Sequence, residues 1–177
     1  LFLRVKKSGE DVRFKKIKHS FSWVLMTFML QGMWVFMCIF PALIVISSFN
    51  SEINNYAIVG SAVWLFGFLF EIVADNQKSN FNKFNKGKFI STGLWSMTRH
   101  PNYFGEFILW LGITIASLGY IDNYKYILLL TPIFVYLLLT RVSGVNLLEE
   151  IGEKRWGDSK EYQKYKEKTP LFFPKIF

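Results

Sequence analysis

The chain of 177 residues is very apolar for its size, with 51% hydrophobic and 19% aromatic residues and a net charge of +8. A soluble domain of this length has too little interior to bury that much apolar surface, so the composition indicates a protein whose solvent is lipid. In such a chain the positive charge is better explained by anionic lipid headgroups than by nucleic acid. We therefore expect the bilayer as a partner, and no nucleic acid.

Four apolar runs are long enough to cross a bilayer as helices. They lie at about residues 21–48, 56–74, 101–121 and 126–142. The first run contains no charged residue, and at about 1.5 Å per residue it exceeds the roughly 30 Å hydrocarbon core. None of the runs alternates with the period of two that is typical of a barrel strand. The sequence therefore predicts an all-α integral membrane protein with four transmembrane helices.

The basic residues predict the orientation of these helices. Of the 21 Lys and Arg, all but Lys125 lie before the first run, between the second and third, or after Thr140 near the end of the fourth. By the positive-inside rule these segments are cytoplasmic, and the connections near 50–55 and 122–125 lie on the other side. Both ends of the chain are then cytoplasmic, in a bacterial inner membrane or in the endoplasmic reticulum, which share this rule.

The same pattern divides the chain into parts. Residues 1–20 form a basic cytoplasmic segment, and residues 21–177 form one membrane domain. Its cytoplasmic tail, residues 143–177, is charged and is expected to contain an amphipathic helix. Because the chain begins with Leu1 in an apolar stretch, we expect its first residues to be the end of a further helix upstream.

Carboxyl groups inside the predicted spans are the strongest indication of chemistry. Glu71 and Asp75 lie four residues apart near the end of the second span, and Asn102 and Glu106 repeat this spacing at the start of the third. A buried carboxylate costs about 2.5–3.5 kcal/mol on insertion scales unless it is paired or faces water. The two pairs therefore predict a polar cavity at one membrane depth, with interfacial acids at helix ends as the alternative.

Further candidates flank these acids. Pro101 fits the first position of a helix with His100 as its N-cap, and Arg99 would make that helix start an anion site. Arg141 and Glu149 continue a four-residue spacing, and either close the same cavity or anchor a helix end. Tyr162, three residues before a second tyrosine in the tail, either covers a ligand or is an interfacial anchor.

Other patterns indicate packing or exclude sites. Glycines recur every seven residues at 60 and 67 and at 105, 112 and 119, which predicts close helix packing. The two histidines, His19 and His100, are too few for a metal site. The sequence contains no GxGxxG, GxxxxGK or GxSxG motif, so a bound nucleotide would lie in a helical cavity.

The stretch Gly93–Glu106, which contains Arg-His-Pro-Asn-Tyr-Phe-Gly-Glu, resembles a signature of the steroid 5-alpha-reductase C-terminal family and its uncharacterised membrane branch. Asp75–Lys78, Ser143–Val145 and the Tyr162-x-x-Tyr165 tail extend the resemblance to about residues 20–177. It implies a helical bundle of six or seven spans, of which this chain holds the C-terminal part. It also implies NADPH bound between the later helices, and hydride transfer to a double bond of a sterol-like or other lipid enone.

Transferred by position, the resemblance gives a set of cofactor-binding residues: Asp75, Arg99, His100, Asn102, Tyr103, Glu106, Arg141, Glu149 and Tyr162. Glu71 departs from the animal enzymes, which carry an amide there. In those enzymes the acid that polarises the substrate belongs to earlier helices, so no catalytic residue is assigned in this chain. A lipid is the expected substrate, and no metal is expected.

Two other functions fit part of the pattern. Membrane methyltransferases that use S-adenosylmethionine share an Arg-His-Pro-x-Tyr segment and a late Glu-Glu pair, here Glu149-Glu150. The full Asn102–Glu106 stretch, Asp75 and Ser143-Gly144 favour the reductase. A non-catalytic lipid-binding subunit would keep the same helices without the chemistry.

Overall fold

The structure, a computed structural model, describes residues 19–48, 52–121, 123, 125–142 and 144–175. The chain divides into two compact units, Leu1–Met37 and Cys38–Phe177. Nearly all of the predicted basic segment 1–20, parts of the two short connections, and Ser143 lie outside the described residues. The features discussed below belong to the second unit.

Every element in the described part of the chain is helical. The α-helices are α3 (Phe21–Ser47), α4 (Asn55–Phe84), α5 (Leu94–Met97), α6 (Pro101–Ser117), α7 (Leu130–Leu137), α8 (Val145–Trp156) and α9 (Lys160–Lys168). Single turns of other helix types are η1 (Leu118–Tyr120), η2 (Lys125–Leu129) and the π-helical η3 (Leu138–Val142). Four helical stretches are long and apolar enough to cross a membrane: Phe21–Ser47, Asn55–Phe84, Pro101–Tyr120 and Tyr126–Trp156. The predicted all-helical fold with four candidate spans is confirmed.

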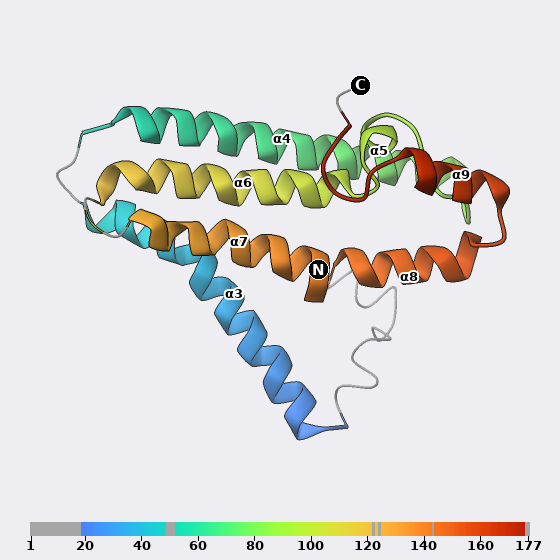
Figure 1. Ribbon diagram of the computed structural model, residues 1–177, viewed down its shortest axis with the longest axis horizontal. Helices are drawn as coiled ribbons and strands as arrows, with labels where there is room; N and C mark the ends of the chain where they lie inside the picture. The colour runs from blue at the N-terminus through green and yellow to red at the C-terminus, as the bar shows by residue number, and fades with distance from the viewer. Residues whose placement is uncertain (1–18, 49–51, 122, 124, 143, 176–177) are drawn as a thin grey trace. The chain divides into compact units, whose positions relative to one another are not determined.

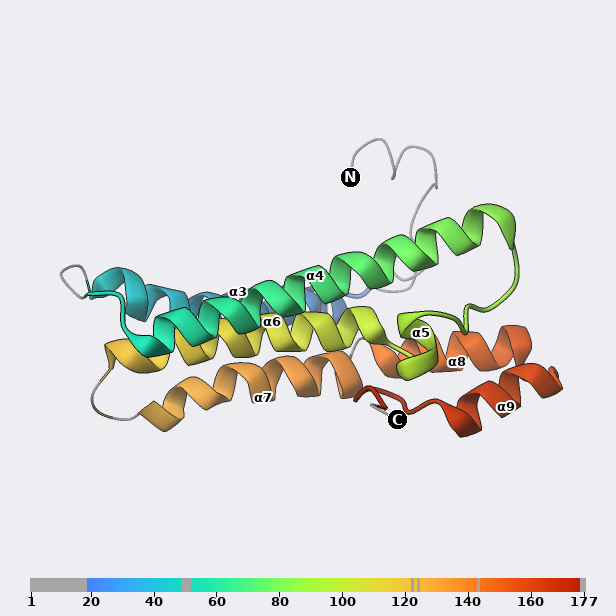
Figure 2. The same ribbon diagram turned by 90° about the horizontal axis from the view of Figure 1, so that it is seen from above.

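In the second unit α6 lies between α4 and α7, and the three run side by side (Figures 1 and 2). The helices α4 and α6 approach so closely that their backbones touch at glycines. A Cβ atom placed on Gly67 would lie 2.5 Å from the backbone nitrogen of Leu109 and 2.7 Å from the carbonyl oxygen of Gly105. Gly60 and Gly112 form an equivalent contact nearer the other end. The close packing predicted from the glycine repeats is confirmed.

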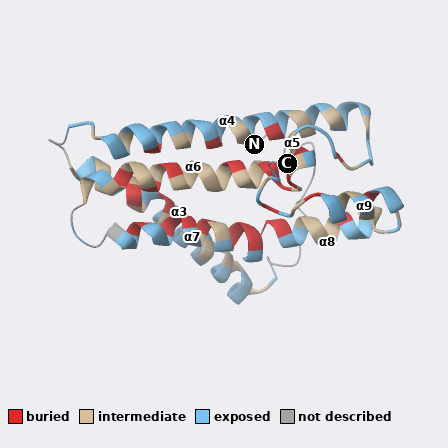
Figure 3. Cartoon of the chain, turned by 45° about the horizontal axis from the view of Figure 1, so that its top comes forward, coloured by how far each residue is buried: buried red, intermediate tan, exposed pale blue. Residues whose placement is uncertain are grey.

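The outer faces of these helices are apolar and uncovered. Figure 3 shows buried residues on the inward faces of α6 and α7, and exposed residues along the outer side of α4. Phe66 and Leu69 of α4 are about half exposed, at 56% and 51%. A continuous apolar face of this size in water would cause aggregation, so it fits a helix that faces lipid.

Two boundaries differ from the expectation. The second helix does not end near residue 74 but continues to Phe84, because the polar stretch beyond Asp75 is also helical. Asn85 caps this helix, with its N–H donating to the Phe81 carbonyl at 2.9 Å. The tail contains two helices instead of one. Ser159 is the N-cap of α9, where its hydroxyl accepts a bond from the Tyr162 N–H. The charge pattern had suggested one continuous helix, but a second helix begins at this residue.

Candidate functional site

A hollow of about 420 Å³ lies at the end of the bundle where α6 begins. Its walls come from the end of α4, the 86–90 connection, α5, the residues before α6, α8 and α9. The extension of α4 beyond the expected span supplies one wall, and the break between α8 and α9 lets the tail fold back as another. The hollow therefore depends on the two boundaries that differ from the expectation.

The polar lining of the hollow is mostly cationic. Its basic side chains are Lys78, Lys86, Lys88, Arg99 and Arg155, joined by His100. Glu149 is its acidic side chain. Five cations around one carboxylate give a strongly positive site, which suits a ligand with several negative charges.

The other walls are aromatic. The ring of Phe89 lies 5.1 Å from Tyr162, 5.6 Å from Tyr165 and 6.0 Å from Trp156, measured between centroids. Across the hollow, the Lys78 ammonium lies 4.8 Å from the centre of the Trp95 ring. Burial raises the pKa of both the Tyr162 and the Tyr165 phenol, so both remain neutral donors at physiological pH.

Local hydrogen bonds fix the elements that carry these side chains. The Trp95 indole donates to the Ala74 carbonyl at 3.0 Å, and the Leu94 N–H donates to the Gln77 side chain at 2.9 Å, which holds α5 against α4. The Trp156 indole donates to the Gly87 carbonyl at 2.7 Å. Gly87 has a φ of 82°, so a glycine suits this turn between Lys86 and Lys88.

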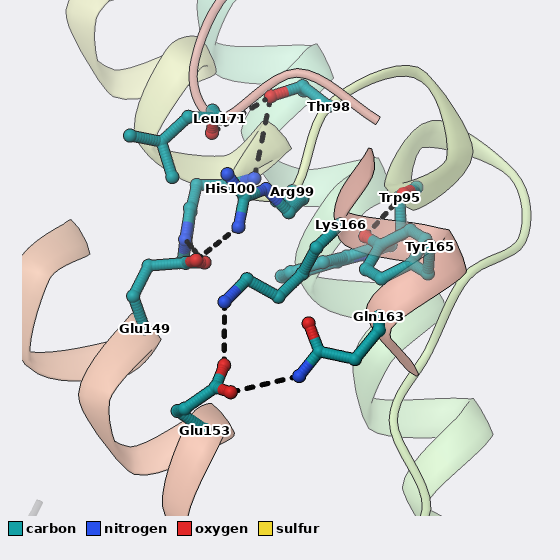
Figure 4. Close-up of polar contacts among 10 residues, drawn as sticks. All are labelled: Trp95, Thr98, Arg99, His100, Glu149, Glu153, Gln163, Tyr165, Lys166 and Leu171. Atoms are coloured by element: carbon teal, nitrogen blue, oxygen red, sulfur yellow. Dashed lines mark hydrogen bonds and ion pairs between the residues drawn. The ribbon is translucent and has the colours of Figure 1, made fainter. Parts of the chain in front are cut away.

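Arg99, His100 and Glu149 form an ion-pair cluster at the base of the hollow (Figure 4). One oxygen of the Glu149 carboxylate pairs with the Arg99 guanidinium, and the other accepts a bond from His100 Nε2 at 2.9 Å. All three side chains are largely buried, with exposed fractions of 14%, 6% and 22% for Arg99, His100 and Glu149. Glu149 therefore fixes both basic groups from a helix fifty residues away in sequence.

Three buried polar atoms next to this cluster have no hydrogen-bond partner within the described part of the chain: Arg99 Nε, His100 Nδ1 and Asn102 Oδ1. Buried polar groups in proteins are nearly always satisfied. The Arg99 Nε–H is a donor that needs an acceptor. His100 contacts Glu149 through Nε2, so its second ring nitrogen, Nδ1, is the one without a partner among the described residues.

The C-terminal segment holds the Arg99–His100 backbone in place. The Arg99 N–H donates to the Pro170 carbonyl at 2.9 Å, and the Thr98 hydroxyl donates to the Phe172 carbonyl at 2.9 Å. On the other side, Lys166 pairs with Glu153 at 2.6 Å and so links α9 to α8 (Figure 4). The tail is thus part of the site's framework.

Comparison with known proteins places the chain in a family without an assigned activity. Residues 1–169 match the family described as Protein of unknown function (DUF1295). The chain belongs to this family. It is also similar to a Probable O-methyltransferase ustE from Ustilaginoidea virens, with 38% identity over 71 residues. That match covers 38% of this chain and 25% of the fungal protein, so the chain spans about a quarter of the relative's length. No solved structure matches the chain.

In this DUF1295 protein, four of the residues predicted to bind a cofactor line the hollow: Arg99, His100, Glu149 and Tyr162. Five do not line it: Asp75, Asn102, Tyr103, Glu106 and Arg141. Tyr103 stacks on His100 with ring centroids 5.9 Å apart. Arg141 is exposed at the π-helical turn. Their assignment to the cofactor stays a prediction.

The intramembrane acids form a second group along the α4–α6 contact. Glu106 of α6 lies within electrostatic reach of Glu71 and Asp75 of α4. Glu71 packs against Gly105, where an added Cβ would lie 2.9 Å from the Glu71 Cβ. The structure thus brings the α4 and α6 acids together, as the spacing predicted, but outside the cationic hollow.

Several residues of the hollow were not among the predicted ones. Lys86, Lys88 and Arg155 look like ordinary exposed charges in the sequence, and Phe89 and Trp156 like unremarkable aromatics. The Gly87 between two lysines, directly after a helix, was the available signal for a turn that presents cations. No group of three or more His, Cys, Asp or Glu among the described residues is arranged to hold a metal.

Proposed function

We propose that this chain forms the cofactor-binding part of a membrane-embedded reductase, which uses NADPH to reduce a carbon–carbon double bond in a sterol-like or other lipid enone. The observation that carries the proposal is the hollow lined by five cationic side chains and one carboxylate. NADPH carries a pyrophosphate and a separate ribose phosphate. Arg and Lys side chains are the groups that proteins use to bind such phosphates.

The unpartnered atoms support the same ligand. Arg99 is fixed by Glu149 through one terminal nitrogen, Nη1, while its buried Nε–H has no acceptor among the described residues. A phosphate or ribose oxygen would satisfy it. His100 Nδ1, also buried, would accept a hydrogen bond from a ribose hydroxyl.

The aromatic walls suit the flat rings of a dinucleotide. Trp95, Trp156 and Tyr165 line the hollow together with Phe89, and each offers a face or an edge to a planar ring. When bound, NADPH would supply a hydride. The chain's own residues would bind it, orient it and exclude water, and the acid that polarises the substrate is not assigned to this chain.

The resemblance to the steroid 5-alpha-reductase family adds Asp75, Asn102 and Glu106 to the proposed cofactor contacts. The buried Asn102 Oδ1 is an acceptor without a donor among the described residues, and a carboxamide N–H or a ribose hydroxyl would satisfy it. Asn102 and Glu106 lie on α6, which begins directly after His100, and Asp75 lies on the adjacent helix α4. They would therefore serve the uncharged part of the cofactor, with the lipid reaching it from the bilayer.

The second candidate is a lipid methyltransferase that uses S-adenosylmethionine. It is favoured by the similarity to the fungal protein named as a probable O-methyltransferase. The charge of the hollow argues against it, since the sulfonium and ammonium of that cofactor would face five cations. The carboxylate that the hollow offers to these positive groups is Glu149, which is already paired with Arg99 and His100.

Thermal unfolding of the purified chain in detergent, with NADPH, NADH or S-adenosylmethionine added, tests the proposal. Saturation at a hundred times Kd stabilises a folded state by about 2.7 kcal/mol, which for a chain of this size shifts Tm by about 5–10 °C. We expect this shift with NADPH, a smaller one with NADH, and none with S-adenosylmethionine.

Two double variants test whether NADPH binds in the hollow. The Lys86→Gln/Lys88→Gln double variant removes two charges from the hollow and should lose most of the NADPH shift. The Lys83→Gln/Lys154→Gln variant removes the same charge from exposed positions that do not line the hollow, and should keep the shift. A shift with S-adenosylmethionine alone would establish the methyltransferase instead. The same NADPH shift in both double variants would remove the hollow from the proposal.

A further inference from the structure

A second hollow, of about 630 Å³, is also lined by α9 and adjoins the hollow proposed to bind NADPH, here called the NADPH hollow. Phe89 and Tyr165 line both hollows and so form the wall between them. The second hollow is basic and rich in hydroxyls. Its polar side chains are Lys164, Lys168, Lys175, Ser91, Ser96, Thr169 and Glu161.

The three lysines approach this hollow from two directions. Lys164 and Lys168 lie four residues apart, hence on one face of α9. Lys175 lies on the C-terminal segment, whose backbone is fixed by a bond from the Lys175 N–H to the Met97 carbonyl at 2.9 Å. Glu161 is the one carboxylate in the lining, so the hollow keeps a positive balance.

The position of the C-terminal segment places this hollow beside the membrane boundary. The candidate span of α6 begins at Pro101, and the segment is hydrogen-bonded to the residues directly before it, Met97 to Arg99. Phe172 of the same segment is buried and packs on Phe107 of α6 at 5.9 Å between ring centroids. The segment therefore lies at the depth where the apolar span meets the polar headgroups.

The same segment exposes apolar side chains next to its lysine. Leu171 and Phe173 are 37% and 55% exposed, while the Phe172 between them is only 5% exposed. An exposed Phe and Leu beside a basic hollow would be costly in water, but they suit a surface that meets acyl chains on one side and headgroup phosphates on the other. Both views show the chain returning from α9 toward α5 and the start of α6 (Figures 1 and 2).

We propose that this second hollow binds the phosphate of an anionic phospholipid headgroup. Lys164, Lys168 and Lys175 supply the positive charge, and the hydroxyl of Ser91 lies in the same lining as a hydrogen-bond donor. Leu171 and Phe173 face the start of the acyl chains. This site is distinct from the NADPH hollow, and its occupant is a lipid of the surrounding bilayer, not the substrate that is reduced.

The test uses the full chain in neutral detergent micelles, doped either with phosphatidylglycerol or with phosphatidylcholine at matched mole fractions. The Lys168→Gln/Lys175→Gln variant removes two charges of the hollow at nearly constant side-chain length. The Lys83→Gln/Lys154→Gln variant removes two charges elsewhere. A third arm adds inorganic phosphate without anionic lipid, and the readout in every arm is the thermal unfolding midpoint as a function of added ligand.

We expect phosphatidylglycerol to stabilise the chain and phosphatidylcholine not to. The half-saturating mole fraction should rise about twenty-five-fold in the Lys168→Gln/Lys175→Gln variant, from roughly fivefold for each interfacial lysine, and should stay unchanged in the Lys83→Gln/Lys154→Gln variant. Equal stabilisation by both lipids, or an equal loss in both variants, would overturn the proposal. Stabilisation by inorganic phosphate as strong as by the lipid would also overturn it, in favour of a site for soluble phosphate.

Discussion

Replacing Gly67 by Ala should separate α4 from α6 and destabilise the bundle. The new Cβ would lie 2.5 Å from the backbone nitrogen of Leu109 and 2.7 Å from the carbonyl oxygen of Gly105. Ordinary contacts between such atoms are about 3.5 Å, so one helix must move by about 1 Å. Both neighbours are backbone, so no side chain can move aside to relieve the contact. Overpacking of this kind lowers the free energy of unfolding by about 1–3 kcal/mol. Because the neighbouring atoms are rigid backbone, we expect a loss near the upper value.

The gain in helix propensity offsets about 1 kcal/mol of that cost, which leaves a net loss of about 2 kcal/mol. For a chain of this size the loss lowers Tm by about 4–8 °C, measured by thermal unfolding in detergent. Gly32→Ala is the matched control, because that helical glycine has no described atom within 4 Å of its added Cβ. The control should unfold at the wild-type temperature or slightly above. If Gly67→Ala unfolds with the control, the close α4–α6 contact is wrong.

Three further substitutions probe the proposed cofactor site. Glu149→Gln removes the carboxylate of the hollow, so it should lower the Kd for NADPH and raise any Kd for S-adenosylmethionine, both measured by titration. A higher Kd for NADPH and a lower Kd for S-adenosylmethionine would reverse our assignment of the cofactor. Trp156→Phe removes the indole bond to Gly87, about 1 kcal/mol, and should weaken NADPH binding severalfold by releasing the turn that carries two lysines. Asn102→Ala should weaken NADPH and NADH alike, by about tenfold, and an unchanged Kd for both would exclude it from the site.

The helices and their contacts were predictable from local patterns. Pro101 begins α6 as expected, because a missing N–H is harmless at the first helical position. The glycine repeats predicted close helix packing, because only a residue without Cβ allows two backbones to touch, and the structure shows that the contact joins α4 and α6. Both inferences depend on residues within one helical turn or on one helix face, where geometry follows directly from spacing.

The hollow was only partly predictable, because its lining depends on contacts between distant segments. Lys86 and Lys88 enter it because α4 continues past its apolar span and then turns at Gly87. Glu149 reaches Arg99 because the chain between α7 and α8 positions a helix fifty residues away in sequence. No local periodicity encodes such a distance, so Arg99, His100 and Glu149 were found by motif and spacing, while the lysines looked like solvent-exposed charges.

The cationic hollow and the acidic group at the α4–α6 contact lie in different parts of the bundle, and this separation would determine the orientation of a bound dinucleotide. The cations gather in the hollow beyond the apolar spans, whereas Glu71, Asp75 and Glu106 gather along the α4–α6 contact within them. Phosphates would be repelled by the acids and attracted by the hollow, so the proposed NADPH has one favourable orientation, with its phosphates in the hollow. Its nicotinamide, which carries the hydride, would then lie toward Asn102 and the bilayer, where a lipid substrate is found. The same charges that bind the cofactor would thereby direct its reactive end.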